Sequence, residues 1–252
     1  MALDRLLTIG HDAKTVKGQK KGYLTGILYL APAQTARIYS SSGAVVNVCP
    51  NATPECKALC LNTAGRGIFD SIQDGRKRKT RLLFADRQAF MVTLRENVKR
   101  LLRIAGRNDY IPVVRLNGTS DIGWESESFG IMQAFPDVQF YDYTKSAIRM
   151  WRYLDGRLPS NYHLTFSRSE TNEADCLGVL SRGGNVAVVF GTRRGDALPK
   201  HWHDYKVLDG DESDLRFLDH DPTSVARFPG LVIGLRAKGK AKTHSGGFVV
   251  PA

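Results

Sequence analysis

The chain has 252 residues, with 36 Lys or Arg against 25 Asp or Glu and a formal net charge of +11. A hydrophobic fraction of 42% can build a substantial core, so disulfide staples are not needed. No apolar run approaches the roughly eighteen residues of a transmembrane helix, and the N-terminus lacks the basic, apolar and cleavage regions of a signal peptide. We therefore expect a cytoplasmic protein with no membrane partner.

The first part of the chain is predicted to hold an arm, two strands and a long helical region. Residues 1–21 form a polar N-terminal arm with little periodicity. Apolar runs predict strands at residues 23–30 and 45–48. Residues 67–106 are helical by pattern, in two segments of which the second begins at Asp86, a residue type that caps helices.

From residue 111 onward, strands and helices are predicted to alternate. Short apolar strands in such an order indicate a parallel sheet. About eight strands in a chain of this length favour a (β/α)8-type, TIM-like barrel, which could be complete or irregular. This barrel would form one α/β domain over residues 22–252. The alternative is an open doubly wound sheet. Strands are predicted at 111–116, 138–141, 162–166, 186–190, 205–208 and 231–235, and helices at 126–135, 145–154 and 172–180.

Three of the four cysteines lie within twelve positions, at Cys49, Cys56 and Cys60. Thr53 and Pro54 have the residue types of an N-cap and a first helical position, which would place Cys56 and Cys60 one turn apart on a short helix. Clustered thiols in a reducing compartment favour a soft metal over a disulfide. We expect an iron–sulfur cluster, in the first place 4Fe-4S, with zinc, a disulfide or chance as the alternatives.

Three cysteines leave one iron of a four-iron cluster without a protein thiolate. Cys176, a non-cysteine ligand or a substrate could complete it. Cys176 lies in a predicted helix with Ala174, Leu177 and Leu180, a setting more typical of a core thiol than of a metal ligand.

Polar and ionisable side chains follow the ends of several predicted strands, where barrels of this type place their sites. Helix caps and turns use the same residue types, which explains part of this pattern. The candidate catalytic residues are Asp121, Asp142, Lys145 and Glu170, with Lys145 or Asp142 for proton transfer; the candidate substrate- or cofactor-binding residues are Asn117, Ser120, Ser167, Asp209 and Asp211.

Two basic runs, Arg76–Arg81 and Arg236–Lys242, account for much of the positive charge. Such runs are often solvated faces, and the functional alternative is attraction to nucleic acid or to a phosphorylated small molecule. His163 lies within a predicted strand, where a packed core residue is more common than a catalytic base. The tryptophans could stack on bases or anchor the packing.

Three cysteines after an early strand of an α/β barrel resemble the layout of radical S-adenosylmethionine enzymes. That resemblance implies S-adenosylmethionine as a further cofactor. The spacing here is six residues and then three, where that superfamily has three and then two, and Leu59 stands where it has an aromatic residue.

A closer resemblance, over residues 17–240, is to the gene-product-88 domain family of actinobacterial phages and plasmids. It implies a mobile-element protein in the host cytoplasm, of undefined activity. The segments that carry it are Cys49-Pro50 with Cys56 and Cys60, and residues 114–121, 140–145, 166–170, 185–190 and 209–211.

Together these features favour an iron–sulfur enzyme acting on a nucleotide, a nucleic acid or a phosphorylated substrate. The alternative is a nucleic-acid-binding or regulatory protein whose metal site is structural or senses redox state. A metal-independent hydrolase or lyase that uses the strand-end carboxylates is the third reading.

Overall fold

The computed structural model describes residues 5–10, 13–40, 42–220, 230–244 and 246–251. The chain folds into two compact units, each built from three separate stretches of sequence. Unit 1 comprises Met1–Pro50, Arg66–Asp142 and Pro159–His163, and unit 2 comprises Asn51–Gly65, Tyr143–Leu158 and Leu164–Ala252. The prediction of a single domain from residue 22 stays a prediction.

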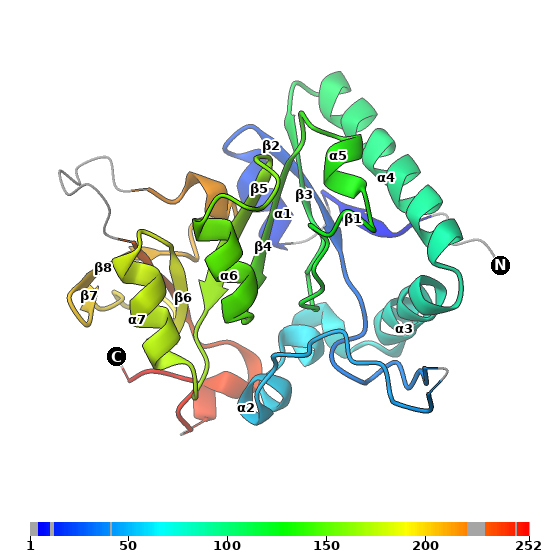
Figure 1. The fold of residues 1–252 in the computed structure, drawn as a ribbon. Coiled ribbons are helices and arrows are strands. Elements are labelled where there is room, and N and C mark those ends of the chain that lie inside the picture. Colours follow the sequence, from blue (N-terminus) through cyan, green and yellow to red (C-terminus); the bar gives the residue numbers. More distant parts are fainter. Residues whose placement is uncertain (1–4, 11–12, 41, 221–229, 245, 252) are drawn as a thin grey trace. The chain divides into compact units, whose positions relative to one another are not determined.

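The fold is mixed α/β, as predicted (Figure 1). The described residues form nine strands in the order β1-β2-β3-β4-β5-β6-β9-β8-β7. The outer pairs β1–β2 and β7–β8 are antiparallel, whereas β2–β3, β3–β4, β5–β6, β6–β9 and β8–β9 are parallel. No pairing among the described residues joins β1 to β7, so the barrel stays a prediction. The strands are β1 Leu7–Ile9, β2 Tyr23–Leu28, β3 Ile111–Arg115, β4 Gln139–Thr144, β5 Tyr162–Ser167, β6 Val186–Phe190, β7 His201–Trp202, β8 Tyr205–Asp209 and β9 Val232–Arg236.

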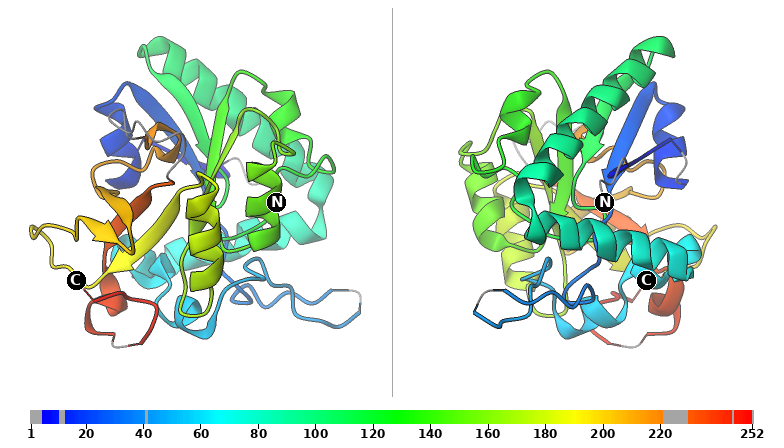
Figure 2. Two further views of the ribbon diagram at one scale, coloured as in Figure 1. Left: turned by 60° about the vertical axis from the view of Figure 1, so that its left-hand side comes forward. Right: turned by 90° about the vertical axis from the view of Figure 1, so that its right-hand side faces the viewer.

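In unit 1, the long helix α4 (Arg87–Arg107) covers β1, β2 and β3, and Figures 1 and 2 show it running beside them. Its apolar residues recur at helical spacing and are buried, as the sequence predicts. Gly26 of β2 allows this close packing, since a Cβ there would lie 3.1 Å from Leu101 Cδ2. Asp86 caps α4 by accepting a hydrogen bond from the Ala89 amide at 2.9 Å, which confirms its predicted role. The other helices of unit 1 are α1 Ala13–Gln19, α3 Asp70–Ala85 and α5 Ile131–Ala134.

Part of the predicted polar arm is regular structure. Residues 7–9 form β1 and residues 13–19 form α1, while residues 1–4 and 11–12 lie outside the described residues. The Asn97 side chain on α4 accepts the Leu6 and Leu7 amides at 2.9 and 3.2 Å, which holds the start of β1 in place. A three-residue strand is too short to show a periodic pattern, which is why the sequence did not indicate it.

Two other predicted elements are wrong. Residues 45–48 form no strand, apart from an isolated antiparallel bridge between Tyr39 and Val45. The Val48 carbonyl accepts the Asp121 amide at 2.8 Å, so this apolar run is fixed by a loop distant in sequence. The predicted helix at 126–135 is reduced to the single turn of α5, which follows Gly130 in a left-handed conformation with φ of 58°.

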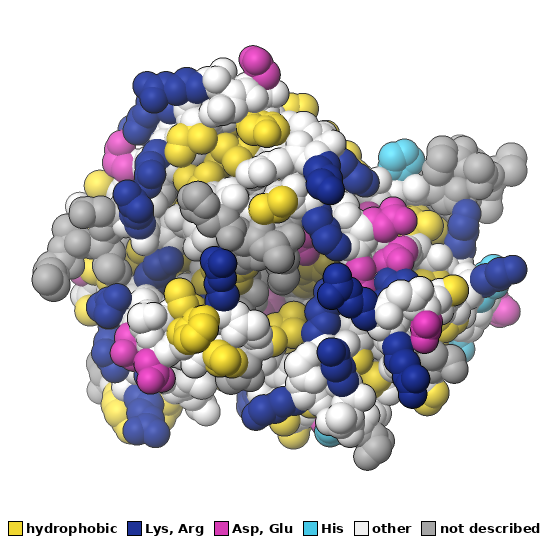
Figure 3. Space-filling view, turned by 180° about the vertical axis from the view of Figure 1, so that it is seen from behind, with side chains coloured by type: hydrophobic (Ala, Val, Ile, Leu, Met, Phe, Trp, Pro, Cys, Tyr) yellow, Lys and Arg dark blue, Asp and Glu magenta, His cyan; other side chains and the backbone are white. Residues whose placement is uncertain are grey.

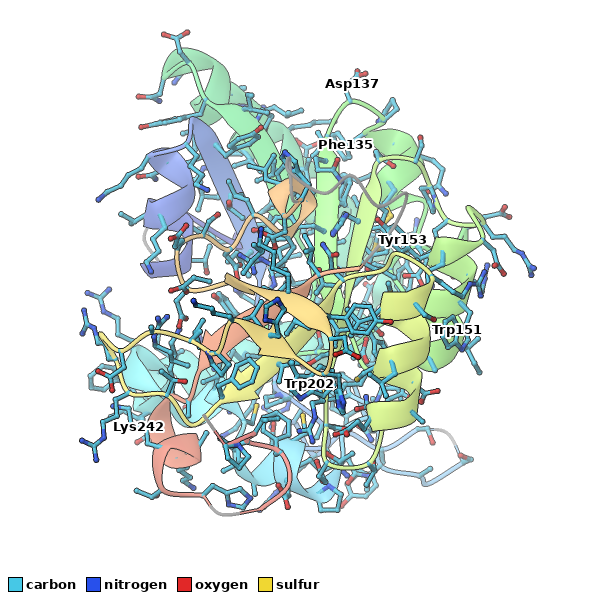
Figure 4. The ribbon with its side chains drawn as sticks, turned by 90° about the vertical axis from the view of Figure 1, so that its left-hand side faces the viewer. Phe135, Asp137, Trp151, Tyr153, Trp202 and Lys242 are labelled. Atoms are coloured by element: carbon cyan, nitrogen blue, oxygen red, sulfur yellow. The ribbon has the colours of Figure 1, made fainter. Side chains whose placement is uncertain are left out.

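In unit 2, helices α6 (Ala147–Leu154) and α7 (Glu173–Ser181) lie side by side (Figure 1). The Trp151 ring on α6 packs against α7 at Gly178, where a Cβ would lie 3.1 Å from the ring. Figure 4 shows Trp151 and Tyr153 on α6 and Trp202 on β7. The remaining helical segments among the described residues are α2 Pro54–Ala58, η1 Leu61–Thr63, η2 Gly65–Ile68, η3 Arg216–Leu218 and η4 Gly239–Thr243.

The tryptophans are packing anchors in these surroundings. Trp124 is fully buried and its ring centroid lies 4.5 Å from that of Phe129. Trp202 is 8% exposed, and the Arg168 guanidinium lies 5.8 Å from its ring centroid. Within the described part of the chain, no helix has the length and apolarity needed to cross a membrane.

We expect Gly118→Ala to lower the free energy of unfolding by about 1–3 kcal/mol in urea denaturation, the usual cost of overpacking. A Cβ at Gly118 would lie 2.7 Å from the Leu28 carbonyl oxygen and 2.6 Å from Tyr29 Cδ1. The control is Gly75→Ala in α3, where the atom nearest to the added Cβ is 3.9 Å away. Because alanine has a higher helix propensity than glycine, this change should raise the free energy of unfolding by at most about 1 kcal/mol. Equal effects in the two variants would contradict this account.

Candidate functional site

The buried carboxylate of Asp142 organises the loop after β3 in unit 1. It accepts hydrogen bonds from the Asn117 amide at 2.7 Å, from Asn117 Nδ2 at 3.2 Å and from the Tyr162 hydroxyl at 3.1 Å. Asp142 is 1% exposed and lies within β4, whereas the sequence placed it just beyond a strand end. In this position Asp142 is a positioning residue for the loop.

The Asn117 side chain, held by Asp142, in turn fixes the rest of the loop. Its Oδ1 accepts the Ser120 hydroxyl at 2.8 Å, the Ile122 amide at 2.9 Å and Trp124 Nε1 at 3.2 Å. The structure therefore brings together three predicted site residues, Asn117, Ser120 and Asp142, in one hydrogen-bonded network. Leucine or alanine at position 117 would remove this acceptor and leave its three donors without it.

The same loop fixes the chain around Cys49, also within unit 1. The Asp121 amide donates to the Val48 carbonyl at 2.8 Å, directly before Cys49. The Ala33 amide donates to Cys49 Sγ at 3.3 Å, and the Cys49 thiol lies 3.6 Å from the Thr119 carbonyl oxygen. Ala33 has a φ of 48°, an uncommon conformation for a residue with a Cβ, and this turn aims its N–H at the sulfur.

In unit 2, Glu170 lies against the start of α2, the helix that carries Cys56. Its carboxylate accepts the Thr53 hydroxyl at 2.7 Å and the Glu55 amide at 3.1 Å. Thr53 is the N-cap, and its Oγ1 accepts the Cys56 amide at 3.3 Å, while Pro54 is the first helical residue. The predicted roles of Thr53 as the N-cap and of Pro54 as the first helical residue are confirmed.

Cys60 lies outside α2, because that helix ends at Ala58 with Leu59 as its C-cap. Cys60 has φ of −56° and ψ of 128°, an extended conformation, and it precedes η1. The prediction that Cys56 and Cys60 share one helical face is therefore wrong. Residues after the last helical turn no longer follow the spacing of four that the prediction assumed.

Lys145 and Ser167 form a second pair of predicted residues within unit 2. Lys145 follows the end of β4 and Ser167 is the last residue of β5, and Lys145 Nζ lies 2.7 Å from Ser167 Oγ. The Phe248 ring centroid lies 5.5 Å from the same ammonium group. A lysine and a serine in hydrogen-bond contact can hold an anionic group or transfer a proton.

Asp209 and Asp211 are held in an ion-pair network of unit 2. Arg236 Nη1 donates to both oxygens of Asp209, at 3.0 and 2.8 Å. Lys238 Nζ donates to Asp211 at 2.6 Å, and the Arg236 amide donates to it at 3.0 Å. Burial raises the pKa of Asp211, but hydrogen bonds from Lys238 and Arg236 outweigh it and hold the pKa below its ordinary value. These contacts join the ends of β8 and β9.

The four cysteines fall into two classes. All are free thiols, and Cys49, Cys56 and Cys60 are partly exposed. Cys176 is fully buried in α7, and burial raises the pKa of its thiol to about 12, as expected of a core cysteine. Cys49 belongs to unit 1 and the other two to unit 2. No group of three or more His, Cys, Asp or Glu side chains among the described residues is arranged to hold a metal ion.

The sequence did not indicate a contact that ties the C-terminal segment to α2. Glu55 Oε2 accepts His244 Nε2 at 3.0 Å and the Phe248 amide at 2.8 Å. The Phe248 hydrogen bond is the main cause of a lowered pKa of Glu55, with His244 as a further cause. A Cβ at Gly246 would meet Glu55 Oε1 and His244 Nε2, so a larger residue there would displace these two side chains. Because these partners are about 190 residues apart, no pattern in the local sequence indicates that they are in contact.

A family model described as gene product 88 matches residues 5–251. The chain belongs to the gene product 88 family. This confirms the resemblance carried by the cysteine segment and by the strand-end segments at 114–121 and 140–145. Neither a curated protein nor a solved structure matches this gene product 88 chain, and the looser resemblance to radical S-adenosylmethionine enzymes finds no support.

We expect Asp142→Asn to lower the free energy of unfolding of this gene product 88 chain by about 1–3 kcal/mol, because the hydrogen bonds lose their charged acceptor. Urea denaturation followed by tryptophan fluorescence would measure it. The control is Asp137→Asn at the exposed turn before β4 (Figure 4), which should change it by less than about 0.5 kcal/mol. A neutral effect of Asp142→Asn would show that the loop does not depend on this carboxylate.

Proposed function

We propose that this phage-family protein is an iron–sulfur enzyme of the host cytoplasm that acts on a nucleotide, a nucleic acid or a phosphorylated small molecule. Cys49, Cys56 and Cys60 would hold the cluster. The proposal depends on one observation, the difference in exposure between Cys176 and the other three cysteines. Three partly exposed cysteines lie close in sequence, while Cys176 is withdrawn into the core with a raised pKa. Metal ligation needs thiolates, so the buried cysteine is the least suited to it.

The surroundings of Cys49 fit a ligand sulfur. An N–H from Ala33 points at Sγ, and hydrogen bonds of this kind stabilise the negative charge of a cluster thiolate. The left-handed backbone at Ala33 costs of order 1 kcal/mol, and such strain is common where a backbone group must meet a ligand. When bound, a 4Fe-4S cluster would supply one-electron chemistry, and an iron without a protein thiolate could bind S-adenosylmethionine.

The remaining predicted residues have roles that follow from their contacts. Lys145, with its ammonium group 2.7 Å from Ser167 Oγ, would bind an anionic group or move a proton. Glu170 would position the segment that carries Cys56, since it accepts hydrogen bonds from Thr53 and Glu55.

We expect protein purified without oxygen to be brown, with iron and acid-labile sulfide at roughly four each per chain. Cys56→Ser should lose most of both, and Cys176→Ser, the matched control, should keep them. Metal analysis and the visible spectrum would test this. A colourless protein with one zinc per chain would contradict the iron–sulfur proposal. If iron is present, a change in the EPR spectrum of the reduced protein on adding S-adenosylmethionine would support an open iron.

A second candidate function, nucleic-acid binding, is favoured by a pocket of about 480 Å³ on unit 1. It is lined by Arg37, Lys77 and Arg81 together with Thr35 and Ala36. Three cations and a hydroxyl around one pocket suit the phosphates of a nucleic acid. Lysine and arginine side chains also spread over the face shown in Figure 3, with smaller groups of acidic side chains among them.

Not all of the basic run at residues 76–81 is available for such binding. Lys79 Nζ donates to the Leu6 carbonyl at 2.6 Å, and burial, with a contribution from Arg76, lowers its pKa to about 8. The Arg76 guanidinium lies 5.0 Å from the Tyr29 ring centroid. The run therefore divides into inward residues that support α3 and outward residues, Lys77 and Arg81, that line the pocket.

We expect Arg81→Gln to weaken binding of a duplex DNA oligonucleotide and to reduce the slope of log K against log salt by roughly 0.9, the value for one phosphate contact. Fluorescence anisotropy over a salt series would measure it. Arg103→Gln, on an exposed part of α4, is the matched control and should change the slope less. An unaltered slope for Arg81→Gln would exclude the pocket as a phosphate site.

A further inference from the structure

Two segments of unit 1 form the walls of the pocket that is lined by Arg37, Lys77 and Arg81. One wall is the loop before Cys49, which contributes Arg37, and the other is α3, which contributes Lys77 and Arg81. Arg37 and Arg81 are exposed, and Lys77 is half-buried. The pocket therefore presents positive charge from two directions, as expected of a site for a phosphate group.

The loop wall has a defined backbone. Arg37 has a φ of 50°, a left-handed conformation that residues with a Cβ seldom adopt. The residues after it are fixed by the Val46 amide, which donates to the Ile38 carbonyl at 2.8 Å, and by the bridge between Tyr39 and Val45. Strained backbone of this kind is common where a side chain must meet a ligand.

Lys77 on the helical wall also pairs with a carboxylate. Its ammonium group lies 3.2 Å from Asp74 Oδ1, three positions earlier in α3, and the two side chains are 36% and 55% exposed. An exposed ion pair at this spacing adds little stability. A phosphate can therefore replace Asp74 as the partner of Lys77 at small cost.

An exposed aromatic side chain follows the cations on each wall. Phe84 of α3 is 46% exposed and comes three positions after Arg81, a spacing at which side chains are neighbours on a helix surface. Because the side chains of a helix lean toward its N-terminus, the Phe84 ring is directed toward Arg81. Tyr39 is 67% exposed and comes two positions after Arg37, which limits the distance between their Cα atoms to about 7 Å.

The exposed aromatic side chains are concentrated at this pocket. Three of the exposed large apolar side chains among the described residues are aromatic, namely Tyr39, Phe69 and Phe84. Phe69 is the N-cap of α3 and lies about 18 Å from Arg81 along the helix, at 1.5 Å per residue. The other two stand within three positions of a cation of the pocket. Cations next to exposed rings are the combination that binds unpaired nucleotides, with phosphates at the cations and bases on the rings.

A double helix would not use these rings. In a duplex the bases are stacked on one another, and a protein reaches the phosphates, the sugars and the base edges. In a single strand the base faces are open and can stack on aromatic side chains. The combination of cations and rings therefore favours a single strand over a duplex.

We propose that the pocket and its two flanking rings bind single-stranded nucleic acid. Arg37, Lys77 and Arg81 bind phosphates, and Phe84 and Tyr39 each stack on a base. The proposal rests on the nucleic-acid-binding candidate above and names the form of nucleic acid that the pocket takes. It does not depend on the iron–sulfur proposal.

The test is the fluorescence anisotropy of a short labelled oligothymidine, alone and as its duplex with oligodeoxyadenosine, titrated with the whole chain. We expect the single strand to bind at least about 10-fold more tightly, because stacking on the rings is available to it alone. Phe84→Leu should raise the Kd for the single strand by about 5- to 100-fold and leave the Kd for the duplex unchanged.

A salt series separates stacking from charge. Phe84→Leu removes no charge, so the slope of log K against log salt for the single strand should stay the same. Arg81→Gln should reduce that slope by roughly 0.7, the value for one phosphate contact with a single strand. A change of slope in Phe84→Leu would contradict its role in stacking.

The matched control is Phe69→Leu, which makes the same exchange at an exposed position outside the pocket and should leave the Kd unchanged. Circular dichroism would show that each variant is folded. Tyr39→Leu should also raise the Kd for the single strand, and it keeps the test decisive if Phe84→Leu fails to fold.

The outcomes distinguish this proposal from nucleic-acid binding in general. Equal affinity for the single strand and the duplex, with equal Kd values in Phe84→Leu and Phe69→Leu, would overturn the single-strand proposal and retain nucleic-acid binding. No binding of either form would overturn both. Iron and sulfide content depends on the cysteines and tests the iron–sulfur proposal alone.

Discussion

The order of unit 1 at its strand ends depends on one buried charge. Asp142 is withdrawn from water, and a carboxylate in that position is stable only when its oxygens are well bonded. Two donors from Asn117 and one from Tyr162 meet this need. Because Asn117 then receives three donors of its own, the loop as far as Trp124 is fixed by a network that starts at Asp142. The predicted catalytic carboxylate is thus also a main support of the fold.

The sequence predicts the regular elements well where a long pattern repeats. The seven strands at β2, β3, β4, β5, β6, β8 and β9 and the helix α4 follow from apolar runs and helical spacing. The sequence predicts badly where contacts between residues far apart in the chain determine the local secondary structure. Residues 45–48 have the composition of a strand, but the Asp121 amide donates a hydrogen bond to the Val48 carbonyl. The first strand, β1, depends on the side chain of Asn97, about 90 residues away.

The candidate site shows the same division. Residue type and position were enough to suggest that Asn117, Ser120 and Asp142 belong together. They could not show that Asp209 and Asp211 are engaged by Arg236 and Lys238, because that depends on which strands are neighbours.

The contact between Glu55 and the C-terminal segment has a consequence for the order of folding. Glu55 is made before its partners His244 and Phe248, which follow some 190 residues later. Chains fold from the N-terminus as they leave the ribosome. The surroundings of Cys56 are therefore completed only after residues 244–248 have been made, and a chain that stops before them lacks the segment that contacts this helix.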